Sequence, residues 1–250
     1  MNKAPPQIFS KTRKQARHLR AASLMEQCET AAFLLDEMAD DLFERLAFLR
    51  HQPPQILLEW FDAQRFSQLP WQHEKRIDTT AATDFDAALP HQSQSYDLAV
   101  SMNSLDTVND LPGALIQMRE LLKPGGLAMA CFIGGQSLPK LRRAMHDAEA
   151  DRPAARLHPL IDPRSCPELL GRAGWMDPVV DSHRLTARYS TLDRLVQDLR
   201  EQALSNVLAK PAAPMTRTAI ERARTAFLAQ ADEDGKVSET FEIVTLTGRR

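Results

Sequence analysis

Two short apolar runs, separated by a helical pattern, mark the middle of the chain. The runs are Leu98–Val100 and Leu127–Ile133, and each has a length typical of a buried strand. Between them, apolar residues recur at the three- and four-residue steps of a helix: Ala114, Leu115, Met118, Leu121 and Leu122. Pro112 suits the first turn of this helix, and the segment Lys123–Gly126 ends it. The order strand, helix, strand predicts a βαβ unit with two parallel strands.

The rest of the chain shows similar alternation. A stripe of apolar residues predicts one amphipathic helix over 26–50, ended by Pro53 and Pro54. Gln55–Glu59 is predicted to be a buried first strand. Further helices are expected over 137–150, 166–173, 191–208 and 216–231, strand six around 179–180 and 185–189, and a final strand over Phe241–Leu246. This pattern predicts an α/β fold whose ligands lie beyond the carboxyl ends of the strands, so Ser101–Val108 are expected to line a crevice.

Composition and charge narrow the class of protein. The chain is 43% hydrophobic and 26% charged, as an ordinary globular protein is. Its net charge is −2, but residues 1–25 carry six Lys or Arg and no acid, so the remainder sums to −8. This basic start is short and carries one aromatic residue, which argues against nucleic-acid binding, and it lacks the apolar core of a secretory signal. No apolar segment approaches the ~20 residues that cross a bilayer.

Cysteine and histidine spacings point to no metal site. Cys28, Cys131 and Cys166 are far apart and match no zinc motif, and the histidines show no ligand spacing. Free cysteines of this kind favour a reducing compartment.

Two segments resemble a known family. VNDLPGALIQMRELLKPGG (108–126) and TFEIVTLTG (240–248) are similar to class I S-adenosylmethionine (SAM) methyltransferases, and more narrowly to the methyltransferase-fold assembly factors of respiratory complex I. The resemblance implies a Rossmann-like methyltransferase fold with an antiparallel last strand, SAM as cofactor and a complex I subunit as protein partner. Together with the helical patterns near the start of the chain, it predicts a helical arm over 1–50 followed by an α/β domain over 51–250. A bacterial cytoplasmic location is expected, with contact to a membrane surface as an option and the mitochondrial matrix as the alternative.

The cofactor half departs from the family pattern. The resemblance places an acid and a glycine-rich turn after the first strand, but Glu59 is followed by Phe61, Ala63 and Arg65 where glycines are expected. Their side chains would project into the space of the ligand, so the turn looks unfit for SAM. In addition, only 30 positions separate Glu59 from Leu89, which predicts that a strand–helix unit is shortened or absent.

Candidate site residues follow from these comparisons. If SAM binds, the residues expected to contact it are Glu59, Asp78, Asp86, Ser101 and Asn103. Asp106 is a weak candidate for a catalytic base, since Asp106-Thr107 stands where the family often has a His-Trp pair. A helix N-cap before Pro112 is expected from Asp110 or its neighbours, and for Asp78 we favour a capping role over contact with a ribose.

A basic helical face is predicted near the start of the chain. Its residues are Lys11, Arg13, Lys14, Arg17 and Arg20. One interpretation is a solvated helix, which is the commoner outcome; the other is an arm over the crevice that contacts an acidic partner or substrate.

Three functions remain open at this stage. The first is a methyltransferase-like protein with a degenerate SAM motif that binds a protein partner in complex I assembly. The second is an active SAM-dependent methyltransferase with a rebuilt turn. The third is another enzyme on this scaffold, such as the arginine hydroxylase activity associated with the complex I family.

Overall fold

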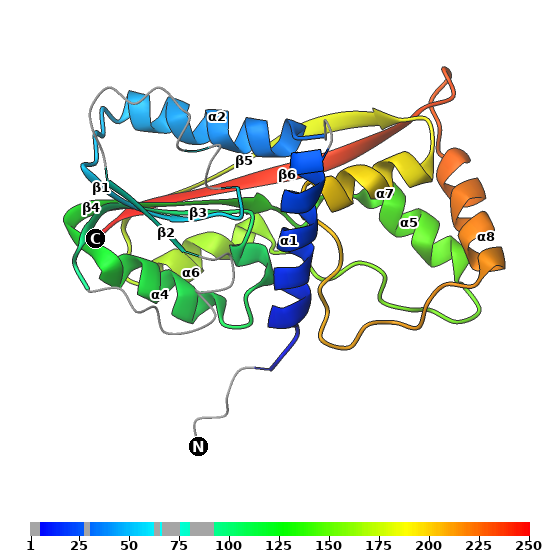
Figure 1. Ribbon diagram of the computed structural model, residues 1–250, viewed down its shortest axis with the longest axis horizontal. Coiled ribbons are helices and arrows are strands. Elements are labelled where there is room, and N and C mark those ends of the chain that lie inside the picture. Colours follow the sequence, from blue (N-terminus) through cyan, green and yellow to red (C-terminus); the bar gives the residue numbers. More distant parts are fainter. Residues whose placement is uncertain (1–5, 28–30, 63–65, 67–75, 81–92) are drawn as a thin grey trace.

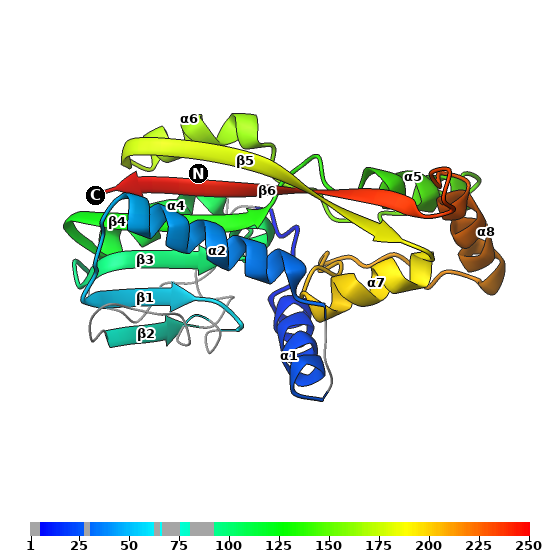
Figure 2. The same ribbon diagram turned by 90° about the horizontal axis from the view of Figure 1, so that it is seen from above.

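The computed structural model describes residues 6–27, 31–62, 66, 76–80 and 93–250. Within them one sheet contains the strands β1 (Gln55–Glu59), β2 (Arg76–Thr80), β3 (Tyr96–Met102), β4 (Leu122–Ile133), β5 (Met176–Tyr189) and β6 (Val237–Arg249). Their order is β2-β1-β3-β4-β6-β5 (Figure 1 and Figure 2). Strands β1 to β4 run parallel, and β6 runs antiparallel to both of its neighbours. The predicted α/β fold, with a mostly parallel sheet and an antiparallel last strand, is confirmed.

Helices cover both faces of this sheet. They are α1 (Lys11–Gln27), α2 (Phe33–Phe48), α4 (Leu111–Leu121), α5 (Pro139–Ala148), α6 (Cys166–Arg172), α7 (Leu192–Glu201) and α8 (Arg217–Leu228). Helix α2 lies on one face, and α4 and α6 lie on the other (Figure 1). Helices α5, α7 and α8 gather around the far end of the long antiparallel pair β5–β6 (Figure 2). Each face has its own core of buried apolar side chains.

Helix α4 forms where the sequence predicts it. Asp110 is its N-cap, and the carboxylate accepts a hydrogen bond of 2.9 Å from the backbone N–H of Gly113. Pro112 occupies the first turn, where a missing N–H costs nothing. The expectation that Asp110 caps this helix is confirmed.

The single helix predicted over 26–50 is wrong. Glu26 belongs to α1, which ends at Gln27, and a separate helix, α2, begins at Phe33. Cys28–Thr30 lie outside the described residues. The first turn of α2 is capped from a distant element, because Glu201 accepts from the N–H of Ala31 at 2.7 Å and Gln202 from that of Leu34 at 2.8 Å. No local signal marks this start, and the apolar stripe therefore read as one helix.

Other boundaries also differ. Helix α7 ends at Glu201 rather than at Leu208, and strand six is one continuous strand, β5, rather than two pieces.

The buried side chains of α2 belong to the same core as those of β1, β3 and β4. The boundary expected at residue 50 therefore does not separate two cores, and we propose that only α1 acts as an arm.

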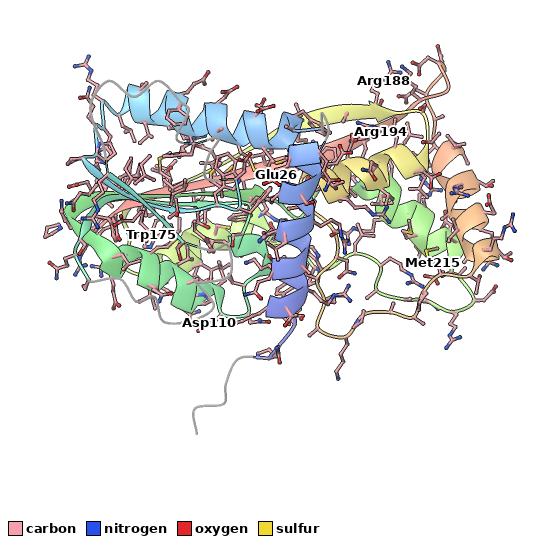
Figure 3. The ribbon with its side chains drawn as sticks, in the orientation of Figure 1. Glu26, Asp110, Trp175, Arg188, Arg194 and Met215 are labelled. Atoms are coloured by element: carbon pink, nitrogen blue, oxygen red, sulfur yellow. The ribbon has the colours of Figure 1, made fainter. Side chains whose placement is uncertain are left out.

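The glycine of the TFEIVTLTG segment has a packing role. A Cβ on Gly248 would lie 2.6 Å from the ring of Trp175, closer than real contacts allow. Trp175 is buried under the sheet, and its indole N–H donates to the carbonyl of Leu115 at 2.9 Å (Figure 3). Gly248 thus lets β6 approach the side chain that ties α4 to the sheet.

In the described part of the chain, none of the helices has the length and apolar character that crossing a membrane requires.

Candidate functional site

The carboxyl ends of the parallel strands meet at one edge of the sheet. Glu59 is the last residue of β1, and in the strand register it lies beside Ser101 of β3. The arrowheads of β1 and β3 both point toward α1 (Figure 2). In open α/β sheets ligands bind at this edge. We call this region, made by Glu59, Ser101, Ser104 and the residues of α1 that face them, the crevice.

The crevice holds a buried polar chain that starts on α1. Nζ of Lys14 donates to the carbonyl oxygen and to Oγ of Ser104, both at 2.9 Å. Oγ of Ser104 donates in turn to Oε1 of Glu59 at 2.8 Å, and the hydroxyl of Ser101 donates to Oε2. Lys14 is 1% exposed and Glu59 is 0% exposed. An ammonium group is buried this deeply only where acceptors replace its water, so Lys14 is an integral part of the crevice.

Arg17 extends the same contact one helical turn further. Its guanidinium donates to the carbonyl of Ser205 at 3.2 Å and to the hydroxyl of Thr107 at 3.3 Å. Burial lowers the pKa of Arg17, and the nearby carboxylate of Asp106 opposes that shift. Arg17 therefore joins α1 to two loops that follow β3 and α7.

His18 completes the inward face of α1. Its ring is stacked on Phe61, with 5.3 Å between ring centroids and 6° between planes. Burial, together with the positive charges of Arg17 and Lys14, lowers the pKa of His18 to about 2. His18 is therefore a neutral, stacked ring at physiological pH.

The segment before α1, which contains Ile8 and Phe9, is also hydrogen-bonded to the body of the protein. The side-chain oxygen of Asn109 accepts from the N–H groups of Ile8 and Phe9 at 2.8 and 2.9 Å, and its amide donates to the carbonyl of Phe9 at 3.1 Å. Phe9 also bridges to Leu208. These contacts hold α1 across the edge of the sheet.

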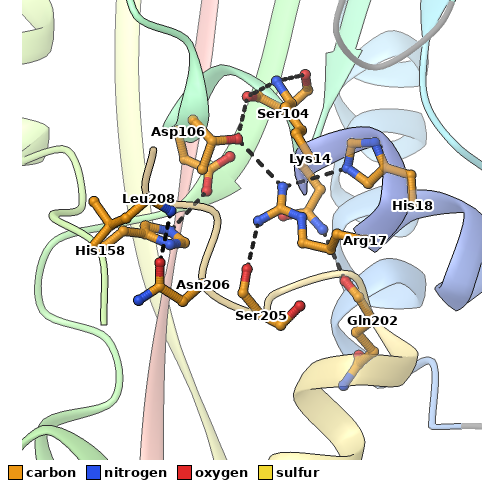
Figure 4. Close-up of polar contacts among 12 residues, drawn as sticks. Lys14, Arg17, His18, Ser104, Asp106, His158, Gln202, Ser205, Asn206 and Leu208 are labelled. Carbon is orange, nitrogen blue, oxygen red and sulfur yellow. Dashed lines mark hydrogen bonds and ion pairs between the residues drawn. The ribbon is translucent and has the colours of Figure 1, made fainter. Parts of the chain in front are cut away.

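A second buried polar group lies beside the crevice. Asp106, in the short 3-10 helix η2 (Leu105–Thr107), is 3% exposed, and its carboxylate lies 3.8 Å from Nε2 of His158 (Figure 4). Burial alone would raise the pKa of Asp106, but His158 and the charges of Arg17 and Lys14 outweigh burial and lower it below its usual range. Asp106 is therefore ionised at neutral pH.

Asp106 and His158 lie in the lining of a pocket of about 260 Å³. The remaining walls come mainly from β4, α5, α7 and the loops beside them, and they are largely apolar: Ile133, Leu138, Leu141, Met145, Leu157, Leu160, Val196, Leu199, Leu204 and Met215. We call this region the apolar pocket. It adjoins the crevice, because Asp106 lines the pocket and also faces Arg17.

The structure brings some of the predicted cofactor-binding residues together and not others. Glu59 and Ser101 are hydrogen-bonded to each other. Asn103 follows β3 with a φ of 52°, and its amide donates to the carbonyl of Gln202 at 3.0 Å. Asp78 lies within β2, and its carboxylate accepts from the hydroxyl of Tyr96 at 2.9 Å and from Arg76 at 3.1 Å; the segment that it was expected to cap lies outside the described residues.

Tyr96 is the first residue of β3, so this contact turns the carboxylate of Asp78 away from the crevice. Asp86, Ala63 and Arg65 lie outside the described residues, as does most of the stretch between Glu59 and Leu89 in which a strand–helix unit is predicted to be shortened or absent.

The basic face is divided by the structure. Lys11, Arg13 and Arg20 are exposed, whereas Lys14 and Arg17 are buried. The interpretation of these residues as one solvated helix face is therefore wrong for Lys14 and Arg17. The loops after β3 and α7 supply oxygen acceptors to these two side chains.

Sequence reasoning also missed His158, a single histidine in a loop. The signal for α1 was present, since Lys14, Arg17, His18 and Ala21 are spaced as one helical face and all are buried. Within the described ranges, no group of three or more His, Cys, Asp or Glu side chains is arranged to hold a metal ion.

The strand order, together with the polar residues at the carboxyl edge of the parallel strands, is that of a Rossmann-like methyltransferase fold. The chain belongs to the methyltransferase domain family, whose model matches residues 21–177.

Two groups of curated relatives stand out. The human mitochondrial arginine-hydroxylase NDUFAF5 is 31% identical over 179 residues, which cover 70% of this chain and 52% of that protein. This chain thus spans about half the length of that relative. The malonyl-[acyl-carrier protein] O-methyltransferase 1 of Coxiella burnetii is 24% identical over 263 residues, covering 98% of this chain and 89% of that enzyme.

Among solved structures, the chain is similar to a methyltransferase of Bacillus halodurans, with a TM-score of 0.49, 11% identity and coverage of 78% of this chain and 91% of that one.

Proposed function

We propose that this protein is a methyltransferase-fold assembly factor that binds a protein partner and does not use SAM. By resemblance, the partner is a subunit of respiratory complex I. The observation that carries the proposal is the buried ammonium of Lys14, which is hydrogen-bonded to Ser104 in the crevice where the family places its cofactor.

The occupied crevice is the main support for the loss of SAM. To lie at the edge beside Glu59, SAM would have to displace Lys14 from Ser104 and separate His18 from Phe61. Displacing a buried and fully paired ammonium is costly, because its acceptors lose a charged donor. The described residues of the crevice therefore do not fit SAM.

The outward face of α1 is the proposed partner surface. Lys11, Arg13 and Arg20 are exposed on it, together with Leu19, which is 72% exposed. A helix that is locked to the body by one face offers the other as a rigid surface. Its positive charge favours an acidic segment of the partner.

Calorimetric titration with SAM tests the loss of the cofactor. We expect no binding in the micromolar range. A dissociation constant near micromolar, about −8 kcal/mol, would overturn the proposal.

Charge reversal tests the partner surface. We expect the triple variant Lys11→Glu, Arg13→Glu, Arg20→Glu to lose co-purifying respiratory-chain subunits. The matched control is Arg142→Glu, Arg143→Glu, Arg222→Glu, on α5 and α8, which should retain them. Equal recovery by both variants would remove α1 from the interface.

An active methyltransferase is the second candidate. The match to malonyl-[acyl-carrier protein] O-methyltransferase over 98% of this chain favours it. The presence of Asp106 and His158 in the apolar pocket also favours it, because such a pair suits proton transfer from a methyl acceptor. The SAM titration separates this candidate from the first.

Arginine hydroxylation is the third candidate, and it rests on the 31% identity to the human relative. Its mark would be an arginine in the recovered partner that is heavier by one oxygen atom, which mass spectrometry of wild-type and knockout cells detects.

A further inference from the structure

Three buried polar atoms without partners lie together where the apolar pocket meets η2. Both carboxylate oxygens of Asp106 and Nδ1 of His158 are buried and have no hydrogen-bond partner among the described residues. Both side chains are more than nine-tenths buried, and both line the pocket. Unpaired buried groups of this kind cost free energy, and in a native protein each calls for a specific cause, such as a catalytic role or a bound species.

Two other polar side chains that line the pocket, Arg156 and Asn206, are hydrogen-bonded to the protein. Arg156 donates to both oxygens of Glu149 at 2.6 Å and to the carbonyl of Ala213 at 2.6 Å. The amide of Asn206 donates to the carbonyls of Ala155 and Arg156 at 3.2 and 2.8 Å, and its oxygen accepts from the backbone N–H of Leu208 at 2.8 Å. Arg200 and Ser205 also line the pocket, but Arg200 is exposed and Ser205 is half-buried, so the deeply buried polar groups that face a pocket ligand are Asp106 and His158.

The protonation states of this pair define the missing group. Asp106 is ionised, so it offers acceptors only. Nε2 is the nitrogen of His158 that faces the carboxylate, which favours the tautomer with the proton on Nε2 and with Nδ1 as an acceptor. The edge contact between Phe9 and His158, with ring centroids 5.7 Å apart, holds that ring in place. Two adjacent acceptors at the end of an apolar pocket require a hydrogen-bond donor.

We propose that the apolar pocket binds a small apolar molecule with a hydroxyl head group, whose O–H donates to Asp106 or to Nδ1 of His158. The body of the ligand lies against side chains of α5, α7 and the 210–216 loop, among them Met145, Leu199 and Met215 (Figure 3 labels Met215). The site needs neither SAM nor the partner surface of α1. Its test is therefore independent of the proposed function.

A matched pair of probes tests the head group on the wild-type protein. The probes are 4-propylphenol and its methyl ether, 4-propylanisole, which have the same apolar body and differ in the donor. We expect calorimetry to show that the phenol binds roughly ten-fold more tightly, since a hydrogen bond to a charged acceptor is worth at least that factor. Equal affinities, or no binding of the phenol, would overturn the proposal.

Labelled methionine methyl groups test the location in the same wild-type protein. Met145 and Met215 line the pocket, while Met176 is 51% exposed at the start of β5. Addition of 4-propylphenol should shift the first two methyl resonances and leave that of Met176 unchanged. Shifts confined to other methionines would place the ligand elsewhere and contradict the assignment.

Variants then test the residues. His158→Phe and Asp106→Asn should each reduce the preference for the phenol over the ether to about two-fold or less. The matched control is His146→Phe, an exposed position on α5 that lies outside the apolar pocket and should keep the full preference. A preference that survives in both site variants, with circular dichroism like that of the wild type, would refute the role of the pair.

Discussion

Two neighbouring regions at the carboxyl edge of the sheet treat their buried polar groups in opposite ways. In the crevice, Glu59 accepts from two serines, and Lys14 donates to one of them. In the apolar pocket, both carboxylate oxygens of Asp106 and Nδ1 of His158 are without hydrogen-bond partners among the described residues. One region is closed by the chain itself, and the other is left able to take a ligand.

We propose that this difference separates two uses of one sheet edge: a crevice filled by the chain itself and a pocket that takes a ligand. The parallel strands bring polar residues to a single edge whatever the protein binds. Helix α1 then decides which part of that edge is filled, because Lys14, Arg17 and His18 all enter the crevice side. The fold is therefore a poor guide to cofactor use, and the packing of α1 is a better one.

The largest effect is expected when the closed region is broken at Lys14. The variant Lys14→Met keeps most of the side-chain volume but removes the ammonium, so Ser104 loses a charged donor in a buried place. We expect the free energy of unfolding to fall by about 2–4 kcal/mol. Urea denaturation measures it.

Lys11→Met is the matched control, because Lys11 is exposed on the same helix. It should change stability by less than about 0.5 kcal/mol. If the two variants lose equal amounts, the buried contact of Lys14 contributes nothing and the comparison of the two regions fails.

The second prediction concerns acid sensitivity of the closed region. His18 has a pKa of about 2 in the folded chain, against 6.5 for the unperturbed side chain. Below about pH 6.5 the unfolded chain therefore binds a proton that the folded chain does not, and stability falls as the pH falls. By about pH 4.5 this one group costs roughly 2.5 kcal/mol relative to neutral pH.

The variant His18→Phe isolates that contribution, because it keeps an aromatic ring against Phe61 and cannot titrate. We expect the loss of stability between about pH 7 and pH 4.5 to be smaller in the variant by about that amount, as chemical denaturation at both values reports. Parallel pH profiles for the two proteins would show that His18 is not held neutral.

Much of the fold and part of the site were accessible from the sequence. The apolar runs predict β3 and β4, and the rule that parallel strands end at one edge predicts that Glu59 and Ser101 meet. The N-cap of α4 was also predictable, because Asp110 and Pro112 are local signals. These features depend on residues close in sequence or on general properties of sheets.

Features that depend on distant partners were not accessible. The start of α2 is fixed by Glu201 and Gln202, which are about 170 residues away, and no neighbouring residue signals it. Burial of Lys14 likewise depends on a serine 90 residues further along the chain. From sequence alone, a basic residue on a helix is expected to be exposed to solvent, because its distant acceptors are not known. A single histidine such as His158 is likewise expected to be an ordinary surface residue until its neighbours in the fold are known.

The smallest effect is expected where the open region is filled. Val196→Leu on α7 adds one methylene group that points toward existing space in the apolar pocket, and leucine is a slightly better helix former. We expect the free energy of unfolding to change by no more than about 0.5 kcal/mol.

The matched variant is Val100→Leu in β3, a residue that is 0% exposed in the sheet core. There the same methylene has no space, and overpacking should cost about 1–3 kcal/mol. Urea denaturation of both variants measures the difference, and an equal cost at the two valines would mean that the pocket is closed in solution.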